Sequence, residues 1–272
     1  MTFESFGRYT IVEELGQGSI ATVYKVHDPD FKREAALKVL PREFMFDTTF
    51  LERFEHEAKT AAELEHPAIV PVYDFGEAEG QPYLVMRYMP GSTLGRHIAR
   101  GPLSLNEATT IIERIGSALD WAHQHHVIHQ DIKPRNILFD GAGDAYLSDF
   151  GIVKLAEATA QLTGSGIIGT PAYIAPEMGS GSLTHLVDVY ALGITLFEIL
   201  AGRRPYQANT SMELLDAHRN HPVPDITAYR TDLPAAIKHV VDHALAKDPA
   251  KRTQHAGDIA AELSQAMDGT AG

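Results

Sequence analysis

The hydrophobic pattern of the chain changes once, at the turn-forming residues 89–92, and this change limits the folds that are available. Before the turn, short alternating or apolar runs predict strands at 9–15, 22–27, 34–40, 69–75 and 82–89, with one helical stretch at 48–65. After it, apolar residues recur at helical spacing in 106–125, 182–201, 211–219, 234–246 and 256–267. The sequence therefore predicts an α+β fold with two lobes, a small β-rich N-lobe at 1–88 with one key helix and a larger α-helical C-lobe at 89–272.

Length and composition agree with two lobes and exclude several classes of function. A single hydrophobic core stops growing near ~250 residues, and this chain has 272 residues, of which 44% are hydrophobic. Its formal net charge of −13 repels nucleic-acid phosphates, so we expect no nucleic-acid partner. The absence of cysteine excludes disulfides, thiolate nucleophiles and Cys-ligated zinc. The histidines at 123–129 lie across a helix end and a loop, and we expect no zinc site there.

Neither a signal peptide nor a membrane span is expected in this chain. Met1 to Arg8 lacks an apolar signal core, and the most hydrophobic stretch, 187–201, contains Asp188 and Glu198 and is too short to cross a bilayer. That stretch predicts a buried helix, and a cytoplasmic location is the default. The alternative expectation is a piece of a longer protein, tethered to the cytoplasmic face of a membrane through C-terminal segments that are absent here.

A glycine-rich turn lies between the first two predicted strands. Residues 16–18 read Gly-Gln-Gly, and Ala21 stands where a third glycine is usual. A dinucleotide-binding turn opens a helix, whereas this turn is followed by an alternating strand at 22–26. Exposed backbone N–H groups in such a hairpin can lie over a polyphosphate, although an ordinary hairpin turn is the alternative.

Two charged residues lie where the pattern predicts burial. Lys38 is the single charge in the apolar run 35–39, and Glu57 is the only charge on the inward stripe formed by Phe50, Phe54 and Ala61. An unpaired buried charge costs several kcal/mol, so we expect Lys38 and Glu57 to pair. A lysine held in this way can point at phosphate oxygens, and a purely structural ion pair is the alternative.

The strongest signal is the run from His129 to Asn136, followed thirteen residues later by Asp149-Phe150-Gly151. In this run, Asp131 can accept a hydroxyl proton and Lys133 can neutralise a phosphate in transfer. The oxygens of Asn136 and Asp149 are hard ligands that suit magnesium. Phosphoryl transfer needs alignment and charge neutralisation more than covalent help, so these groups predict that chemistry.

With these motifs in this order, the chain resembles the eukaryotic-type (Hanks-type) protein kinases, and among them the bacterial Ser/Thr kinases. The resemblance extends from the glycine-rich turn through Glu177 to Arg252. It implies transfer of the γ-phosphate of ATP, bound with Mg²⁺ or Mn²⁺, to Ser or Thr hydroxyls of proteins, the chain itself included. It also implies that Lys38 binds the α/β-phosphates with Glu57 as its partner, that Asp131 is the catalytic base assisted by Lys133, and that Asn136 and Asp149 hold the metal.

The resemblance implies further roles that spacing does not show. It implies that Met86 is the gatekeeper and that 87–89 form the hinge whose backbone binds adenine. It also implies that Glu177 and Arg252 form a buried ion pair and that Asp188 holds the catalytic loop. The segment 169–171 and Lys133-Pro134 resemble the Ser/Thr-specific pattern. The implied nucleotide-binding set is Leu15, Gly16, Gln17, Gly18, Ser19, Val23, Ala36, Lys38, Met86, Arg87, Tyr88, Met89 and Leu138.

Two departures from the family pattern keep alternatives open. Ala21 replaces the third glycine, and Gln130 replaces the arginine expected before the catalytic Asp, which puts the usual phosphate switch on the 152–169 loop in doubt. A non-catalytic scaffold and a small-molecule phosphotransferase are the rival readings. The long segment between Asp149 and Glu177 argues against the second. A homodimer is a further expectation about partners.

Overall fold

The computed structural model describes residues 5–18, 21–150, 171–178 and 183–268. The predicted functional loop at 152–169 and the predicted nucleotide ligand Ser19 lie outside these residues. The described chain forms two compact units. The first unit takes its residues from 1–65 and 69–90 and adds Asp149 and Phe150, and the second takes its residues from 66–68, 91–148 and 170–272. The division at 90–91 falls within the Pro-Gly turn where the hydrophobic pattern changes.

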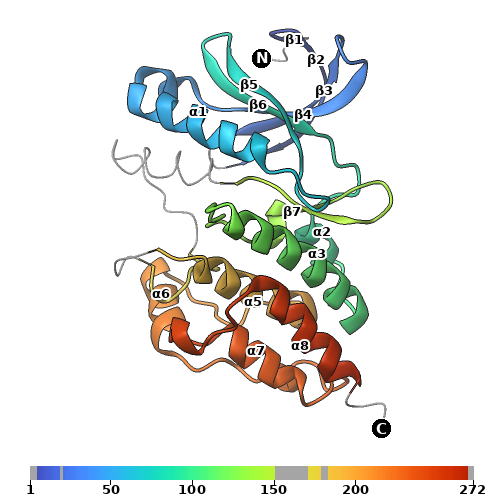
Figure 1. Cartoon of the computed structure of the whole chain (residues 1–272), viewed down its shortest axis with the longest axis vertical. Helices are drawn as coiled ribbons and strands as arrows, with labels where there is room; N and C mark the ends of the chain where they lie inside the picture. The colour runs from blue at the N-terminus through green and yellow to red at the C-terminus, as the bar shows by residue number, and fades with distance from the viewer. Residues whose placement is uncertain (1–4, 19–20, 151–170, 179–182, 269–272) are drawn as a thin grey trace. The chain divides into compact units, whose positions relative to one another are not determined.

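The first unit is built on one antiparallel sheet with the strand order β1-β2-β3-β4-β6-β5 (Figure 1). Its strands are β1 (Ser5–Phe6), β2 (Tyr9–Gln17), β3 (Thr22–Asp28), β4 (Arg33–Val39), β5 (Val72–Ala78) and β6 (Gln81–Arg87). The predicted strands are confirmed, with boundaries that differ by up to three residues. β1 was not predicted, because two residues are too few to show an alternating pattern.

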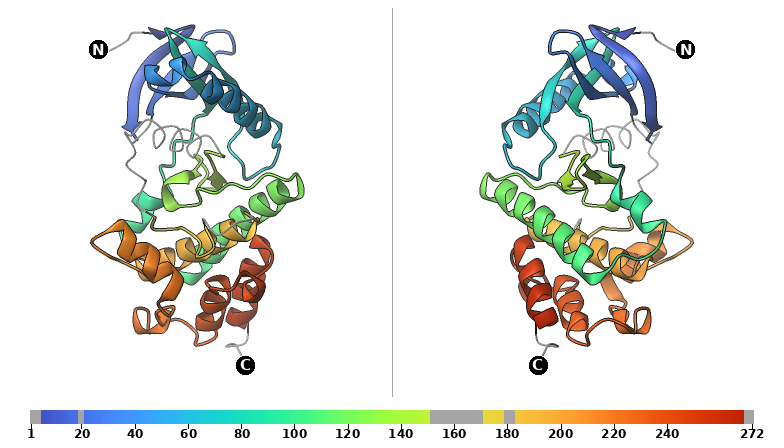
Figure 2. Two further views of the ribbon diagram at one scale, coloured as in Figure 1. Left: turned by 90° about the vertical axis from the view of Figure 1, so that its left-hand side faces the viewer. Right: turned by 90° about the vertical axis from the view of Figure 1, so that its right-hand side faces the viewer.

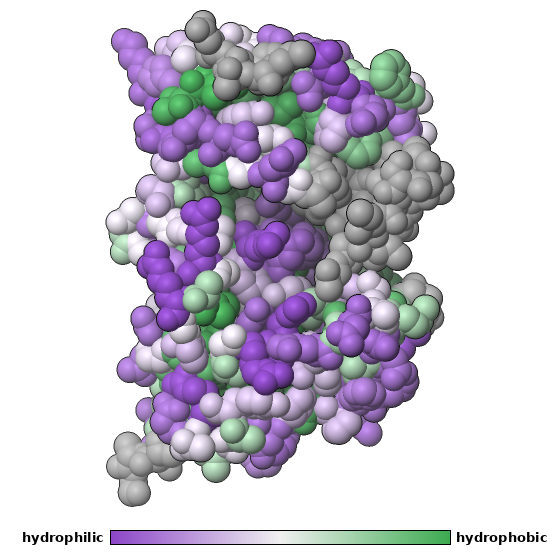
Figure 3. Space-filling model, turned by 180° about the vertical axis from the view of Figure 1, so that it is seen from behind, coloured by the Kyte–Doolittle hydropathy of each residue, from purple (hydrophilic) through white to green (hydrophobic). Residues whose placement is uncertain are grey.

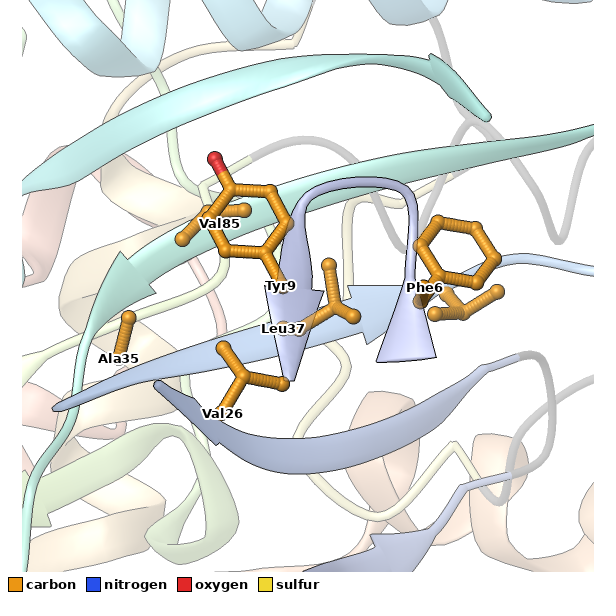
Figure 4. Packing of buried hydrophobic residues seen from close by; sticks show 7 residues of the cluster. Phe6, Tyr9, Val26, Ala35, Leu37 and Val85 are labelled. Atoms are coloured by element: carbon orange, nitrogen blue, oxygen red, sulfur yellow. The ribbon is translucent and has the colours of Figure 1, made fainter. Parts of the chain in front are cut away.

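The two faces of this sheet have different roles. A hydrophobic cluster on one face contains Val26, Leu37 and Val85, and Phe6 and Tyr9 close it from the N-terminal strands (Figure 4). Side chains alternate along a strand, so the neighbours of Leu37 on β4, which include Lys38, point to the opposite face. The cluster therefore stabilises the sheet from one side and leaves the other face to the predicted phosphate-binding lysine.

Helix α1 (Thr48–Glu63) lies beside β5 in the first unit. The Asp47 side chain caps its N-terminus by accepting a hydrogen bond from Phe50 N at 3.0 Å. The predicted apolar stripe is confirmed, because Phe50, Phe54 and Ala61 are buried. The preceding 3₁₀ turn (Arg42–Phe46) places Phe44 on Phe50 with ring centroids 4.3 Å apart, which secures the start of the helix.

The second unit is mainly helical. Its helices are α2 (Leu94–Ile98), α3 (Leu105–Gln124), α5 (Leu186–Ala201), α6 (Ser211–Asn220), α7 (Ile237–Ala244) and α8 (Ala256–Asp268). Its two short strands, β7 (Ile137–Phe139) and β8 (Ala145–Leu147), pair antiparallel, and 3₁₀ turns lie at Pro134–Asn136, Ile226–Ala228 and Pro249–Lys251. The five predicted helices are confirmed. Helix α2 and the β7-β8 pair were missed, because segments of three to five residues are too short for a periodic signal.

Helix α5 lies in the core of the second unit, as the 187–201 pattern predicts. Its residues are buried on nearly every side, and α3 and α8 pack side by side next to it (Figure 2). Helices α3 and α6 begin with capping boxes, formed by Ser104 with Glu107 and by Thr210 with Glu213. Among the described helices, none is long and apolar enough to cross a membrane. The surface seen in Figure 3 is mainly hydrophilic, with hydrophobic residues interspersed.

Residues 66–68, which lie between α1 and β5 in the chain, belong to the second unit, although the segments before and after them belong to the first. Leu147 N donates to Ala68 O at 2.8 Å, Arg114 Nη2 donates to Pro67 O at 3.2 Å, and His66 Nε2 lies 3.2 Å from Ser117 Oγ. The backbone of this short loop is therefore fixed by α3 and β8.

Candidate functional site

Lys38 forms an ion pair with Asp149 in the first unit. The lysine is 7% exposed, and its Nζ lies 2.6 Å from Asp149 Oδ1. The expected pair between Lys38 and Glu57 is not formed in this structure. Glu57 is half-buried on α1 and makes no hydrogen bond or ion pair with a described residue. A buried ammonium needs one close anion, and here the carboxylate of Asp149 meets that need.

The backbone at Asp149 has an uncommon conformation. Its φ is +66°, in the left-handed region that aspartate tolerates better than most residues. Gln130 also has a positive φ, +65°, in the second unit. Such conformations cost free energy and are found most often at functional sites. Both residues belong to the motifs from which the sequence predicts phosphoryl transfer.

Three predicted nucleotide-binding residues share one sheet face with Lys38. In the strand register, Val23 pairs with Lys38 and Ala36 pairs with Met86, and Ala36 is two residues from Lys38 on β4. Directly paired residues and residues two apart point to the same face, so these four side chains do too. This face lies opposite the hydrophobic cluster of Figure 4.

The other predicted nucleotide-binding residues are distributed over both units. Leu15 is half-buried on β2, and Leu138 is half-buried on β7 in the second unit. Arg87 ends β6 and donates its backbone N–H to Pro71 O at 3.0 Å. The Tyr88 ring lies 4.7 Å from Lys25 Nζ, and Met89 is buried. The predicted hinge is thus a strand end that leads into the Pro-Gly turn.

The glycine-rich turn joins β2 to β3, as the alternating pattern after it predicts. Gly16 pairs with Val23, Gln17 pairs with Thr22, and Gly18 N donates to Ala21 O at 2.8 Å. A Cβ added at Gly16 would have no described atom within 4 Å. Packing within the described chain therefore does not require glycine there, whereas close approach of a ligand to the backbone would favour it.

In the second unit, Asp131 is held by two neighbours from the same loop. Asn136 Nδ2 donates to Asp131 Oδ2 at 2.8 Å and to the Asp131 backbone carbonyl at 2.8 Å. Lys133 Nζ donates to Asp131 Oδ1 at 2.7 Å. Both of these hydrogen bonds are donated by the side-chain nitrogen of Asn136. Its side-chain oxygen is therefore the atom that could coordinate a cation. The structure thus brings together Asp131, Lys133 and Asn136, as the motif predicts.

Asp188, at the start of α5, anchors the predicted catalytic loop. It is fully buried, and its carboxylate accepts from His129 N at 2.8 Å and from Gln130 N at 2.7 Å. His123 Nε2 lies 2.9 Å from the same carboxylate. The role that the resemblance implies for Asp188 is confirmed by these contacts. The sequence did not predict the part of His123, which lies 65 residues away in the chain.

One ion pair and one hydrogen bond hold the segment 171–178. Arg252 forms a bidentate pair with Glu177, at 2.7 and 3.0 Å, which confirms the implied ion pair. Tyr173 donates its hydroxyl to Glu198 Oε2 at 2.5 Å. Burial raises the pKa of Glu198, and donation from Tyr173 partly opposes that shift. Sequence analysis missed the second pair, since Glu198 is one of two acidic residues in an apolar helix and nothing local identifies its partner.

Comparison with known proteins shows to which family the whole chain is similar. The family model for the protein kinase domain matches residues 9–265. The chain is 39% identical to the serine/threonine-protein kinase PrkC of Bacillus subtilis over 96% of its own length and 41% of that protein. It is also 39% identical to the serine/threonine-protein kinase PknH of Mycobacterium bovis, over 96% of its length and 44% of the relative. The chain therefore spans less than half the length of these relatives.

Solved structures show the same fold. The crystal structure of the PknI kinase domain of Mycobacterium tuberculosis matches with a TM-score of 0.76 and 31% sequence identity, over 96% of this chain and 97% of that one. The observed elements, an antiparallel sheet with one helix and a separate helical unit, are those that the sequence predicts for a kinase fold. The motifs, the contacts among the predicted site residues and the match over most of the chain lead to one assignment. This chain belongs to the protein kinase domain family.

Proposed function

We propose that the chain transfers the γ-phosphate of ATP to Ser or Thr hydroxyls of proteins, its own hydroxyls included. The observation that carries the proposal is the Asp131 carboxylate, held by Lys133 and Asn136 on a loop that Asp188 anchors. A carboxylate fixed in this way can accept the proton of an acceptor hydroxyl as the oxygen attacks phosphorus. The names of PrkC and PknH, both serine/threonine-protein kinases, support the acceptor class.

The proposed roles follow from the chemistry of each side chain. Lys133 neutralises negative charge on the phosphate in transfer, since its ammonium is already next to Asp131. Lys38 binds phosphate oxygens, and Asp149 is its charge partner until nucleotide enters. The oxygens of Asn136 and Asp149 would hold Mg²⁺ or Mn²⁺, which supplies charge neutralisation of the polyphosphate when bound.

The nucleotide-binding face of the first unit supports the same proposal. Val23, Ala36 and Met86 give that face an apolar floor beside Lys38. An apolar surface with one charged group suits a planar base joined to a polyphosphate. The glycines of the β2-β3 turn carry no side chain, so a phosphate can approach the backbone closely there.

Incubation with labelled ATP and Mg²⁺ tests the proposal directly. Wild-type protein should label itself and a degenerate Ser/Thr peptide library, and Asp131→Asn should not, although it keeps the shape of the side chain. Asp258→Asn, an exposed aspartate at the start of α8, is the matched control and should label at the wild-type rate. If wild type binds ATP but labels nothing, the chain is a scaffold. If it labels only small molecules, the acceptor class is wrong.

Partners and location are further proposals. We expect the substrates to be proteins. The isolated chain is either a monomer or a homodimer. We expect a cytoplasmic position, and any longer form of the protein would be tethered to the cytoplasmic face of a membrane. Light scattering of the purified chain distinguishes monomer from dimer. Substitution of Mg²⁺ by Mn²⁺ in the labelling assay shows which ion supports transfer.

A further inference from the structure

Helix α6 supports the backbone of the segment 171–178. Arg219 Nε donates to Pro176 O at 3.3 Å, and its Nη2 donates to Met178 O at 3.3 Å. Next to it, His218 is buried with 1% exposure, and the backbone of Ala172 lies beside its ring. The sequence motifs identify neither Arg219 nor His218. One helix turn therefore contacts both ends of the segment.

The start of the segment lies within electrostatic range of the loop that carries Asp131. Burial raises the pKa of the Tyr173 phenol, and the charges of Arg204 and of Arg135, two residues after Lys133, oppose that shift. The far end of the segment is fixed by the Glu177–Arg252 pair. Residues 171–178 thus extend from the neighbourhood of the catalytic loop to α6.

The supporting turn of α6 is itself fixed to the rest of the second unit. Lys247 Nζ donates to His218 O at 2.6 Å and to Tyr206 Oη at 2.9 Å. The Tyr206 hydroxyl donates to His221 O at 3.3 Å. These bonds satisfy carbonyls at the helix C-terminus that have no partner within the helix. The turn that carries Arg219 is therefore a rigid support.

We propose that Arg219 is a positioning residue, which holds the backbone at Pro176 and Met178 in the shape that receives the acceptor protein. It then sets the affinity for the acceptor and leaves the affinity for ATP unchanged, because its hydrogen bonds go to Pro176 and Met178, which are outside the predicted nucleotide-binding set. A guanidinium can bond two carbonyls at once through its planar set of donors, whereas a lysine ammonium does so poorly. The inference rests on the proposed phosphotransfer.

Steady-state kinetics on the full chain tests the proposal. The acceptor is the single peptide that wild type phosphorylates best in a degenerate Ser/Thr library, and KM is measured for that peptide and for ATP. Arg219→Gln and Arg219→Lys remove one or both carbonyl contacts, and Arg219 is exposed, so both variants should fold. Arg100→Gln, which replaces an exposed arginine whose side chain makes no hydrogen bond or ion pair with a described residue, is the charge-matched control.

The expected result is a KM for the peptide that rises roughly tenfold in Arg219→Gln, as the loss of two hydrogen bonds allows. Arg219→Lys should lie between this variant and wild type, with kcat, the KM for ATP and the melting temperature near wild type. An unchanged KM for the peptide overturns the proposal, as does an equal rise for peptide and ATP. A lower melting temperature with unchanged kinetics shows a structural role only and also overturns it. Failure of wild type to label any peptide overturns the proposed function instead.

Discussion

His218 should make the second unit sensitive to mild acid. Its ring lies between two tyrosine rings, with centroids 5.8 Å from Tyr190 and 5.0 Å from Tyr206, and Nδ1 is 3.0 Å from the Tyr190 hydroxyl. Burial, followed by the nearby charge of Lys247, lowers the pKa of His218 from 6.5 to about 4. The folded protein therefore holds this imidazole neutral at a pH where the unfolded chain would already be protonated.

The direction and the size of the effect follow from linkage. A folded pKa below the unfolded one means that the unfolded state binds the proton first as the pH falls. The stability that the neutral His218 ring contributes is therefore fully present above pH 6.5 and is lost as the pH falls toward about 4. With these two pKa values, the loss at pH 5 is about 2 kcal/mol, an order-of-magnitude figure, and it approaches ~3 kcal/mol near pH 4.

Urea unfolding at pH 7 and pH 5 measures this loss. Carboxylates also titrate in this range, so the informative quantity is the difference between wild type and His218→Gln, which cannot take up the proton. Between pH 7 and pH 5, wild type should lose about 2 kcal/mol more than this variant. His239→Gln, which replaces an exposed histidine of the same unit, should lose as much as wild type. Equal losses in wild type and His218→Gln would refute the reasoning.

Two further predictions concern regulation. Glu57 makes no hydrogen bond or ion pair with a described residue, so Glu57→Gln should shift the free energy of unfolding by no more than ~0.5 kcal/mol, and calorimetry checks this. If Glu57 pairs with Lys38 during turnover, the same variant should label at least tenfold more slowly; a loss of several degrees with normal labelling would show a structural pair instead. The other prediction concerns three loop hydroxyls, those of Thr159, Thr163 and Ser165. Because glutamine at position 130 cannot form an ion pair with a phosphate, triple alanine substitution should lower kcat/KM by less than about tenfold, under ~1.4 kcal/mol. A hundredfold loss in a variant with an unchanged thermal transition would contradict it.

Much of the fold and of the site's chemistry was determined by local sequence. Hydrophobic periodicity predicted the strands of the first unit and the long helices of the second, because each pattern repeats over enough residues to be read without tertiary contacts. The motif from His129 to Asn136 predicted a catalytic loop, and the hydrogen bonds of Asp131 with Lys133 and Asn136 span at most five residues. Contacts between residues that are this close in the chain can be predicted from a local motif. The same locality explains why β1, α2 and the β7-β8 pair, with two to five residues each, escaped prediction.

Tertiary structure decided which charged groups meet. Sequence analysis assigned Lys38 to Glu57, because both were charges in apolar surroundings, but the partner in the structure is Asp149, 111 residues away. The carboxylate of Asp188 meets two backbone N–H groups and His123, and Arg219 meets the backbone of 176–178, across 41 to 65 residues of chain. No periodicity encodes such pairings. A buried charge dictates only that some partner be present, and the packing of helices and strands decides which residue comes within reach.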